Sequence, residues 1–308
     1  METTEKKEEV FSDTSKFTKL KNDPLEDNLQ NCRKSVRSLK NYVNSKTYAK
    51  LLPTEANKKS YGKLKRHKDE MPVRPIVSSV NSLVGGCEEF LFNIMKSLQK
   101  NCEFSIDSTK QFKEVFLKNR AKFNPKTCEI MSYDARSLYT FTNIKKTVNY
   151  IVQEIYKDPK SYFNEGTQVV KDQVRDIPFP PKRTFKNFIM DVLTKFNSFS
   201  SVNGFYTQND GLSMGSKLSP LISNLYCNLM ERKIIKQWQK QKKILMDVRY
   251  VDDICVVLYR FVTYFNLSIM RDFRLIFYWQ IILNFRIYRH IRRDFSRKNR
   301  ASMGTDLR

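Results

Sequence analysis

Apolar residues recur at the spacing of amphipathic helices in several stretches of the chain. Between Leu25 and Tyr48 they return every three or four residues, which predicts a helix with one buried face. The same spacing predicts further helices over residues 90–98, 112–117, 144–156, 185–196 and 218–238.

Short apolar runs with β-branched residues predict strands. They lie at Val73–Val80 and at Glu129–Tyr133, and two more flank a turn, at Val248–Val251 and Ile254–Leu258. The polar, proline-punctuated segment Asp158–Pro181 is expected to be a loop or insertion.

Composition adds a strong charge to this pattern. The chain has 308 residues, of which 40% are hydrophobic, so it is long and apolar enough for a real core and is not disordered by composition. Its formal net charge of +24 favours an anionic partner, and nucleic acid is the commonest one. A solvated cationic surface is the plainer explanation of the charge.

The cysteines and the lengths of the apolar runs argue against several classes of protein. The six cysteines form no CxxC pair and only two histidines are present, so neither a zinc pattern nor a disulfide framework is predicted. Reduced core cysteines of an intracellular protein are expected instead. Residues 1–9 do not resemble a signal peptide. The longest apolar run, Phe273–Phe285, is short and contains Arg274 and Gln280, so no membrane span is predicted.

The basic residues change in kind near Tyr259. Before Arg260 there are 35 Lys and 10 Arg, whereas from Arg260 onward there are 1 Lys and 10 Arg, and no glutamate follows Glu231. A frameshifted or mis-spliced tail over 260–308 is the favoured interpretation, and an authentic Arg-rich arm is the alternative.

The strongest candidate chemistry lies at Tyr250–Asp253. Adjacent carboxylates in a tight turn between apolar strands repel each other, and a bound dication would relieve that repulsion. An ordinary polar hairpin turn is the alternative. Asp134, at the tip of the strand Glu129–Tyr133, supplies a third carboxylate, as two-metal nucleotidyl transfer requires. A helix N-cap is the alternative role for Asp134.

Two further segments are weaker signals. Gly211–Pro220 combines glycines and small residues before a helix, which permits close approach of backbone to a ligand. Tyr61–Lys68 and Val73–Ser79 place cations where they could hold a triphosphate, although a solvated basic loop would look the same.

Taken in order, these segments resemble the reverse transcriptases of Penelope-like retroelements. That family carries segments like YGLPKIHK and LRPIVSS, then DVVSLFTNI, GxAMGSPLSP and RYVDDIFVVL. Here the corresponding stretches are Tyr61–Lys68, Val73–Ser79, Asp134–Thr140, Gly211–Pro220 and Arg249–Leu258.

The resemblance implies an α+β fold of the right-hand polymerase type. Residues 1–45 would form a partly helical N-terminal extension, residues 46–259 the fingers and a βαββαβ palm, and residues 260–308 an atypical tail in place of a recognisable thumb.

The resemblance also implies an RNA-directed DNA polymerase of a retrotransposon. Asp134, Asp252 and Asp253 would hold two Mg²⁺ ions. The residues implied to contact substrate are Lys65 and Arg74 at the triphosphate, Tyr139 at the sugar, and Gly215 and Ser216 along the nucleotide and template path. The partners would be an RNA template, a DNA primer and deoxynucleoside triphosphates, inside the cell and by family in the nucleus. The alternative is a catalytically dead nucleic-acid-binding relic of such an element.

Overall fold

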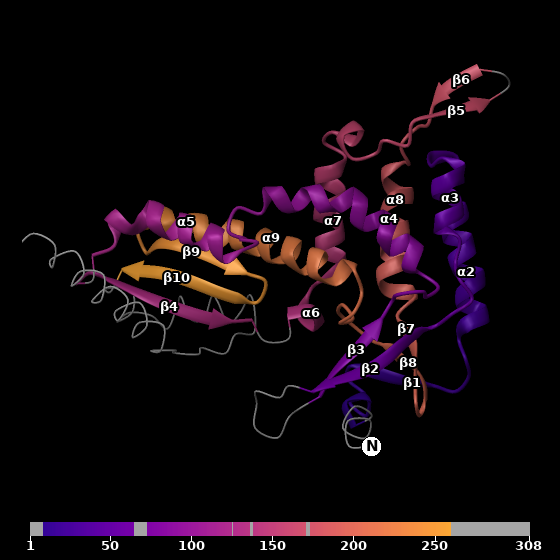
Figure 1. Ribbon diagram of the computed structural model, residues 1–308, viewed down its shortest axis with the longest axis horizontal. Coiled ribbons are helices and arrows are strands. Elements are labelled where there is room, and N and C mark those ends of the chain that lie inside the picture. Colours follow the sequence, from indigo (N-terminus) through magenta and orange to yellow (C-terminus); the bar gives the residue numbers. More distant parts are fainter. Residues whose placement is uncertain (1–8, 65–72, 125, 136–137, 171–172, 260–308) are drawn as a thin grey trace, which may run out of the picture. The chain divides into compact units, whose positions relative to one another are not determined.

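The computed structural model describes residues 9–64, 73–124, 126–135, 138–170 and 173–259. Lys65 and the Arg-rich tail, residues 260–308, lie outside the described residues. The chain forms two compact units (Figure 1). The first comprises Met1–Cys102 and Tyr139–Leu229, and the second comprises Glu103–Leu138 and Met230–Arg308.

A five-stranded sheet lies in the first unit, with the order β1-β8-β7-β2-β3. The strands are β1 (Phe17–Leu20), β2 (Lys58–Leu64), β3 (Val73–Ser78), β7 (Ser198–Ser201) and β8 (Gly204–Gln208). All neighbours are antiparallel except β2 and β7. On this sheet Phe11, Phe17, Phe199 and Tyr206 form an aromatic cluster with Val77. Phe11 and Phe17 near the N-terminus therefore pack as part of this unit.

Helices build the main core of the first unit. They are α2 (Leu25–Arg37), α3 (Ser45–Leu51), α4 (Gly85–Met95), α6 (Leu138–Phe141, which begins in the second unit), α7 (Ile144–Ile155) and α8 (Lys182–Met190). The apolar face predicted for α2 is buried through Leu29, Cys32 and Val36. α7 and α8 lie side by side (Figure 1), and both contribute buried residues to the same core.

Short elements join these helices. They are the 3₁₀ turns η1 (Lys40–Tyr42), η2 (Lys96–Asn101) and η4 (Pro159–Ser161), and a π-helical turn η5 (Asp191–Lys195) that continues α8. The segment expected to be a loop contains a two-stranded hairpin, β5 (Thr167–Val170) and β6 (Gln173–Asp176).

The second unit is built on a three-stranded antiparallel sheet with the order β4-β10-β9. Its strands are β4 (Cys128–Asp134), β9 (Ile244–Tyr250) and β10 (Asp253–Tyr259), and α5 (Thr109–Asn119) lies along one face of the sheet (Figure 1). The aromatic residues of α5 pack against the buried residues of that face. A 3₁₀ turn, η3 (Arg120–Lys122), follows α5, and the long helix α9 (Leu218–Lys240) contributes residues to both units. The complete βαββαβ palm of the expectation is not confirmed, because three strands of this sheet lie in the described part of the chain.

None of the six cysteines forms a disulfide, and five of them are buried. In the part of the chain that the structure describes, every helix is too short or too polar to span a membrane.

Candidate active site

The hairpin between β9 and β10 carries the predicted catalytic turn. Tyr250 pairs with Asp253 across the hairpin, so Val251 and Asp252 form a two-residue loop. Val251 has a φ of 57°, which a β-branched residue rarely adopts. Backbone strain of this kind persists only where the surrounding structure holds it, and it is common at functional turns.

A buried ion pair holds this strained turn. Arg249 is fully buried, and its Nε donates to Glu231 Oε1 at 2.5 Å while its Nη2 donates to Oε2 at 3.1 Å. The remaining arm, Nη1, donates to the Val251 carbonyl at 3.1 Å. The backbone of Arg249 bonds in turn to Phe104 and Ile106. The guanidinium therefore fixes the turn to α9, which supplies Glu231.

Asp247 adds a second carboxyl group to this buried cluster. Burial raises the pKa of Asp247 well above its ordinary value, the charge of Glu231 raises it further, and Arg249 opposes both. Its Oδ1 has no hydrogen-bond partner among the described residues. Such a group is costly to bury, so the cluster is expected to respond strongly to changes in charge.

The third predicted carboxylate lies opposite the hairpin. Asp134 is the last residue of β4 and pairs directly with Asp253 of β10. The Ala135 N–H donates to the Asp252 carbonyl at 2.9 Å, so Asp252 is adjacent in the backbone as well. Asp134 does not cap the following long helix, because the side chain of Asn143 caps α7.

The electrostatics show that the three carboxylates interact. Burial raises the pKa of Asp253, and the charges of Asp252 and Asp134 raise it further. Directly opposed residues in an antiparallel pair have Cβ atoms about 4.5–5.5 Å apart, so Asp134 and Asp253 share one face of the sheet. Three carboxylates at one end of a sheet are the donors that Mg²⁺ prefers. In the described part of the chain, however, no three acidic, histidine or cysteine side chains converge into a metal-binding cluster.

A hollow of about 710 Å³ opens beside Asp253. Its walls are Tyr250, Val248 and Ser132 from the sheet, and Ser108 and Phe112 from the start of α5. It therefore lies on the face of the sheet that carries Asp253 and offers both apolar and polar walls.

The other predicted residues lie on the first unit. Arg74 on β3 is exposed and stands directly opposite Lys63 on β2. Like charges that face each other across a strand pair are destabilising unless an anion lies between them. Lys58, at the start of β2, is not part of this basic surface, because it is 4% exposed and pairs with Glu88.

Tyr139 lies on α6 and is half-buried against the main core. Its carbonyl accepts from the Leu212 N–H at 2.8 Å, which joins α6 to the Gly211–Lys217 loop. A Cβ at Gly211 would lie 2.5 Å from the Thr140 Cα, so glycine is required there.

Gly215 and Ser216 approach the protein itself. Gly215 has a φ of 112°, and a Cβ there would lie 2.5 Å from the Val77 carbonyl oxygen. Ser216 is buried, and its hydroxyl donates to Glu88 Oε2 at 2.9 Å. The small residues of this loop thus allow close contact with β3 and α4, whereas the sequence pattern suggested close approach to a ligand.

Comparison with known proteins gives matches to structure alone. No protein-family model and no curated protein matches the sequence. The apo telomerase of Candida tropicalis matches with a TM-score of 0.53 and 13% identity, over 87% of this chain and 45% of that one. The telomerase of Candida albicans, solved with a fragment of telomeric RNA, matches with a TM-score of 0.51 and 14% identity, over 87% and 44%.

The fold is similar to that of telomerase. A C. tropicalis telomerase truncated of its C-terminal domain gives the same result, with a TM-score of 0.50 and 13% identity over 88% of this chain and 50% of that one. This chain spans half or less of the length of these structures. At such identities the likeness concerns the polymerase-like fold and does not extend to activity.

Sequence reasoning missed the buried polar residues around both sites. Glu231, Asp247 and Arg249 support the hairpin, and Glu88 and Lys58 support the glycine-containing loop. Arg249 opens the segment that resembles RYVDDIFVVL, and the resemblance does not say whether its side chain is buried. Its place inside an apolar strand run is the signal that could have suggested burial.

Proposed function

We propose that this chain is the reverse-transcriptase region of a Penelope-like retroelement and acts as an RNA-directed DNA polymerase. The observation that carries the proposal is the pairing of Asp134 with Asp253 beside Asp252 at the end of one sheet. The polymerase-like fold supports it, as do the order of the sequence motifs and the net charge of +24.

In this proposal the three carboxylates hold two Mg²⁺ ions. The ions, when bound, would neutralise phosphate charge and lower the pKa of the primer 3′-hydroxyl. Asp134 and Asp252 would be direct ligands. Burial and the charges of Asp252 and Asp134 raise the pKa of Asp253, and bound cations would oppose that shift by stabilising its carboxylate.

The remaining residues would bind and orient the substrates. Arg74 and Lys65 would hold the triphosphate of the incoming nucleotide, and Tyr139 would lie against its sugar. Gly215 and Ser216 would shape the wall of the nucleotide and template path through the backbone. The Arg249–Glu231 pair would keep the Val251–Asp252 turn in its strained conformation.

The proposed partners are an RNA template, a DNA primer and deoxynucleoside triphosphates. One of the similar telomerases was solved with an RNA fragment, which agrees with an RNA template. The place of action would be inside the cell, in the nucleus.

Primer extension tests the proposal. The full chain is mixed with a DNA primer annealed to an RNA template, Mg²⁺ and one deoxynucleoside triphosphate at a time. Addition of only the complementary nucleotide, abolished by chelation of Mg²⁺, is expected. Tight binding of the duplex without any addition would instead support the non-catalytic relic.

A further inference from the structure

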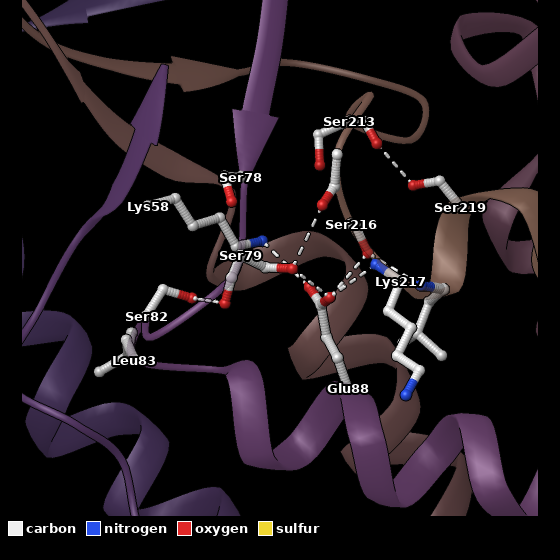
Figure 2. Close-up of polar contacts among 12 residues, drawn as sticks. Lys58, Ser78, Ser79, Ser82, Leu83, Glu88, Ser213, Ser216, Lys217 and Ser219 are labelled. Carbon is white, nitrogen blue, oxygen red and sulfur yellow. Dashed lines mark hydrogen bonds and ion pairs between the residues drawn. The ribbon is translucent and has the colours of Figure 1, made fainter. Parts of the chain in front are cut away.

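Glu88 is a buried carboxylate on α4 at the meeting point of three segments (Figure 2). Its Oε2 accepts from the hydroxyls of Ser79 at 2.6 Å and Ser216 at 2.9 Å, and from the Lys217 backbone N–H at 3.1 Å. Its Oε1 lies 3.5 Å from Lys58 Nζ. Glu88 is 2% exposed, so its carboxylate is sheltered from water.

The donors come from elements far apart in sequence. Lys58 opens β2, Ser79 directly follows β3, and Ser216 and Lys217 lie in the loop before α9. The β2–β3 hairpin carries Arg74, and the loop carries Gly215. Glu88 therefore contacts two of the three segments of the first unit to which the proposed function assigns nucleotide contacts; the third is α6, which carries Tyr139.

The backbone around Glu88 allows little adjustment. The Val77 N–H donates to the Met214 carbonyl at 2.6 Å, and Gly215 has no room for a side chain against Val77. The Ser219 hydroxyl closes the loop by donating to the Ser213 carbonyl at 2.6 Å (Figure 2). A loop held this closely follows any movement of the group to which it is bound.

Stability alone does not explain why the Glu88 carboxylate is buried beside Lys58. A buried ion pair is often no more stabilising than apolar residues of the same volume, because both charges must be desolvated. Its attested use is to fix one geometry among alternatives. A carboxylate with four donors from three segments suits that use.

We propose that Glu88 is a positioning residue that fixes the spacing between the β2–β3 hairpin and the Gly211–Lys217 loop, and thereby the site of the incoming triphosphate. This inference rests on the proposed function for its link to the nucleotide. The position of the loop itself does not depend on that function.

The test compares Glu88→Gln with Glu89→Gln in the full chain. Glu89 is the next residue, is exposed, and pairs with the side chain of the same Lys217, so its variant removes an equal charge without touching the backbone contact. A third variant, Lys58→Met with Glu88→Gln, removes the buried cation too and guards against unfolding of the single variant. Thermal melting reports the folding of each protein.

Two readouts decide the outcome. In Glu88→Gln and in the double variant, hydrogen exchange in the peptide containing Lys217 should quicken by about tenfold or more, because its amide no longer donates to a charged acceptor. In primer extension, KM for the nucleotide should rise by about tenfold, with a smaller change in kcat, because nucleotide binding is affected more than the chemical step. Glu89→Gln should match the wild type in both.

Each contrary result has its own meaning. Exchange at Lys217 that is equal in Glu88→Gln and Glu89→Gln overturns the positioning role. Faster exchange with an unchanged KM overturns the link to the nucleotide. A wild-type protein that extends no primer refutes the proposed function, while the exchange readout still decides whether Glu88 positions the loop.

Discussion

Neighbouring residues of the same type have opposite environments in this protein. Glu88 is buried among four donors, whereas Glu89 is exposed and pairs with Lys217. Lys58 is buried, whereas Lys59 is exposed. The side-chain contacts decide which charge is held inside the protein, and near the candidate site Arg249 and Glu231 are both buried and form such a contact.

Removing the charge of Glu231 should destabilise the second unit. The Glu231→Gln variant leaves the buried Arg249 guanidinium opposite a neutral amide, and breaking a buried pair in this way costs about 3–5 kcal/mol. The matched control is Glu103→Gln, because Glu103 forms an exposed pair with Lys236 in the same unit. Exposed pairs contribute about 0–1 kcal/mol. Urea unfolding measures the free energy of unfolding of both variants. Equal destabilisation of the two would refute the supporting role of the buried pair.

The buried carboxyl group of Asp247 should make stability depend on pH. Its pKa is raised in the folded state above the ordinary value of 3.8, so the folded state holds the proton more tightly than the unfolded state does. Its contribution to stability is complete below that ordinary value and declines as pH rises toward the raised pKa. Asp247→Asn should therefore flatten the decline. The free energies of unfolding of both proteins at about pH 5 and about pH 8 provide the comparison. An equal change between the two pH values in both proteins would show that Asp247 does not cause the pH dependence.

Elements with a strong apolar pattern were predictable from the sequence. The strands around Tyr250–Asp253, the strand ending at Asp134 and the helices α7 and α9 all lie close to their expected positions. In α7 and α9 apolar residues recur at helical spacing and many of them are buried, and most residues of the short apolar runs in β9 and β10 are buried. Asp134 ends β4 and Asp253 begins β10, so the antiparallel pairing of these two strands places the two residues opposite each other.

Other elements depend on tertiary contacts that no local pattern reveals. β2 lies in a lysine-dense segment, and β1, β7 and β8 are short and partly polar; they are strands because each pairs with a neighbour in the five-stranded sheet. The Gly215 and Ser216 contacts were unpredictable for the same reason, since Val77 and Glu88 lie over a hundred residues away.

The β2–β3 hairpin carries exposed cations whose role in nucleic-acid binding can be tested. Lys59, Lys63 and Arg74 are exposed on it, and Lys63 faces Arg74 directly. Replacing all three by Gln should weaken binding to every nucleic-acid sequence alike. The slope of log affinity against log salt should fall by up to about 0.7–0.9 for each phosphate that the variant no longer neutralises.

The control for the hairpin removes three exposed cations elsewhere on the same unit, namely Lys34, Arg37 and Lys40. Its salt slope should stay close to that of the wild type. A hairpin variant that loses affinity for one sequence only would show that these residues read bases, contrary to the prediction.

The whole molecule combines a polymerase-like fold with a large positive charge. The charge explains attraction to nucleic acid but not catalysis, because a relic would keep it. The carboxylates at the end of the β4-β10-β9 sheet distinguish an active polymerase from a non-catalytic relic. Among them, Asp252 is the proposed direct metal ligand on the strained turn.

Single-turnover primer extension by Asp252→Asn is therefore the most direct test of the central claim. The control is Asp176→Asn, an equal charge change on the exposed β6 strand. We predict that Asp252→Asn binds the primer–template duplex as the wild type does but extends it more than about a hundredfold more slowly, beyond the 10–100-fold typical of residues that only support a metal ligand. Asp176→Asn should extend normally. Equal extension by Asp252→Asn and the wild type, or binding without extension by the wild type itself, would contradict the proposed catalysis.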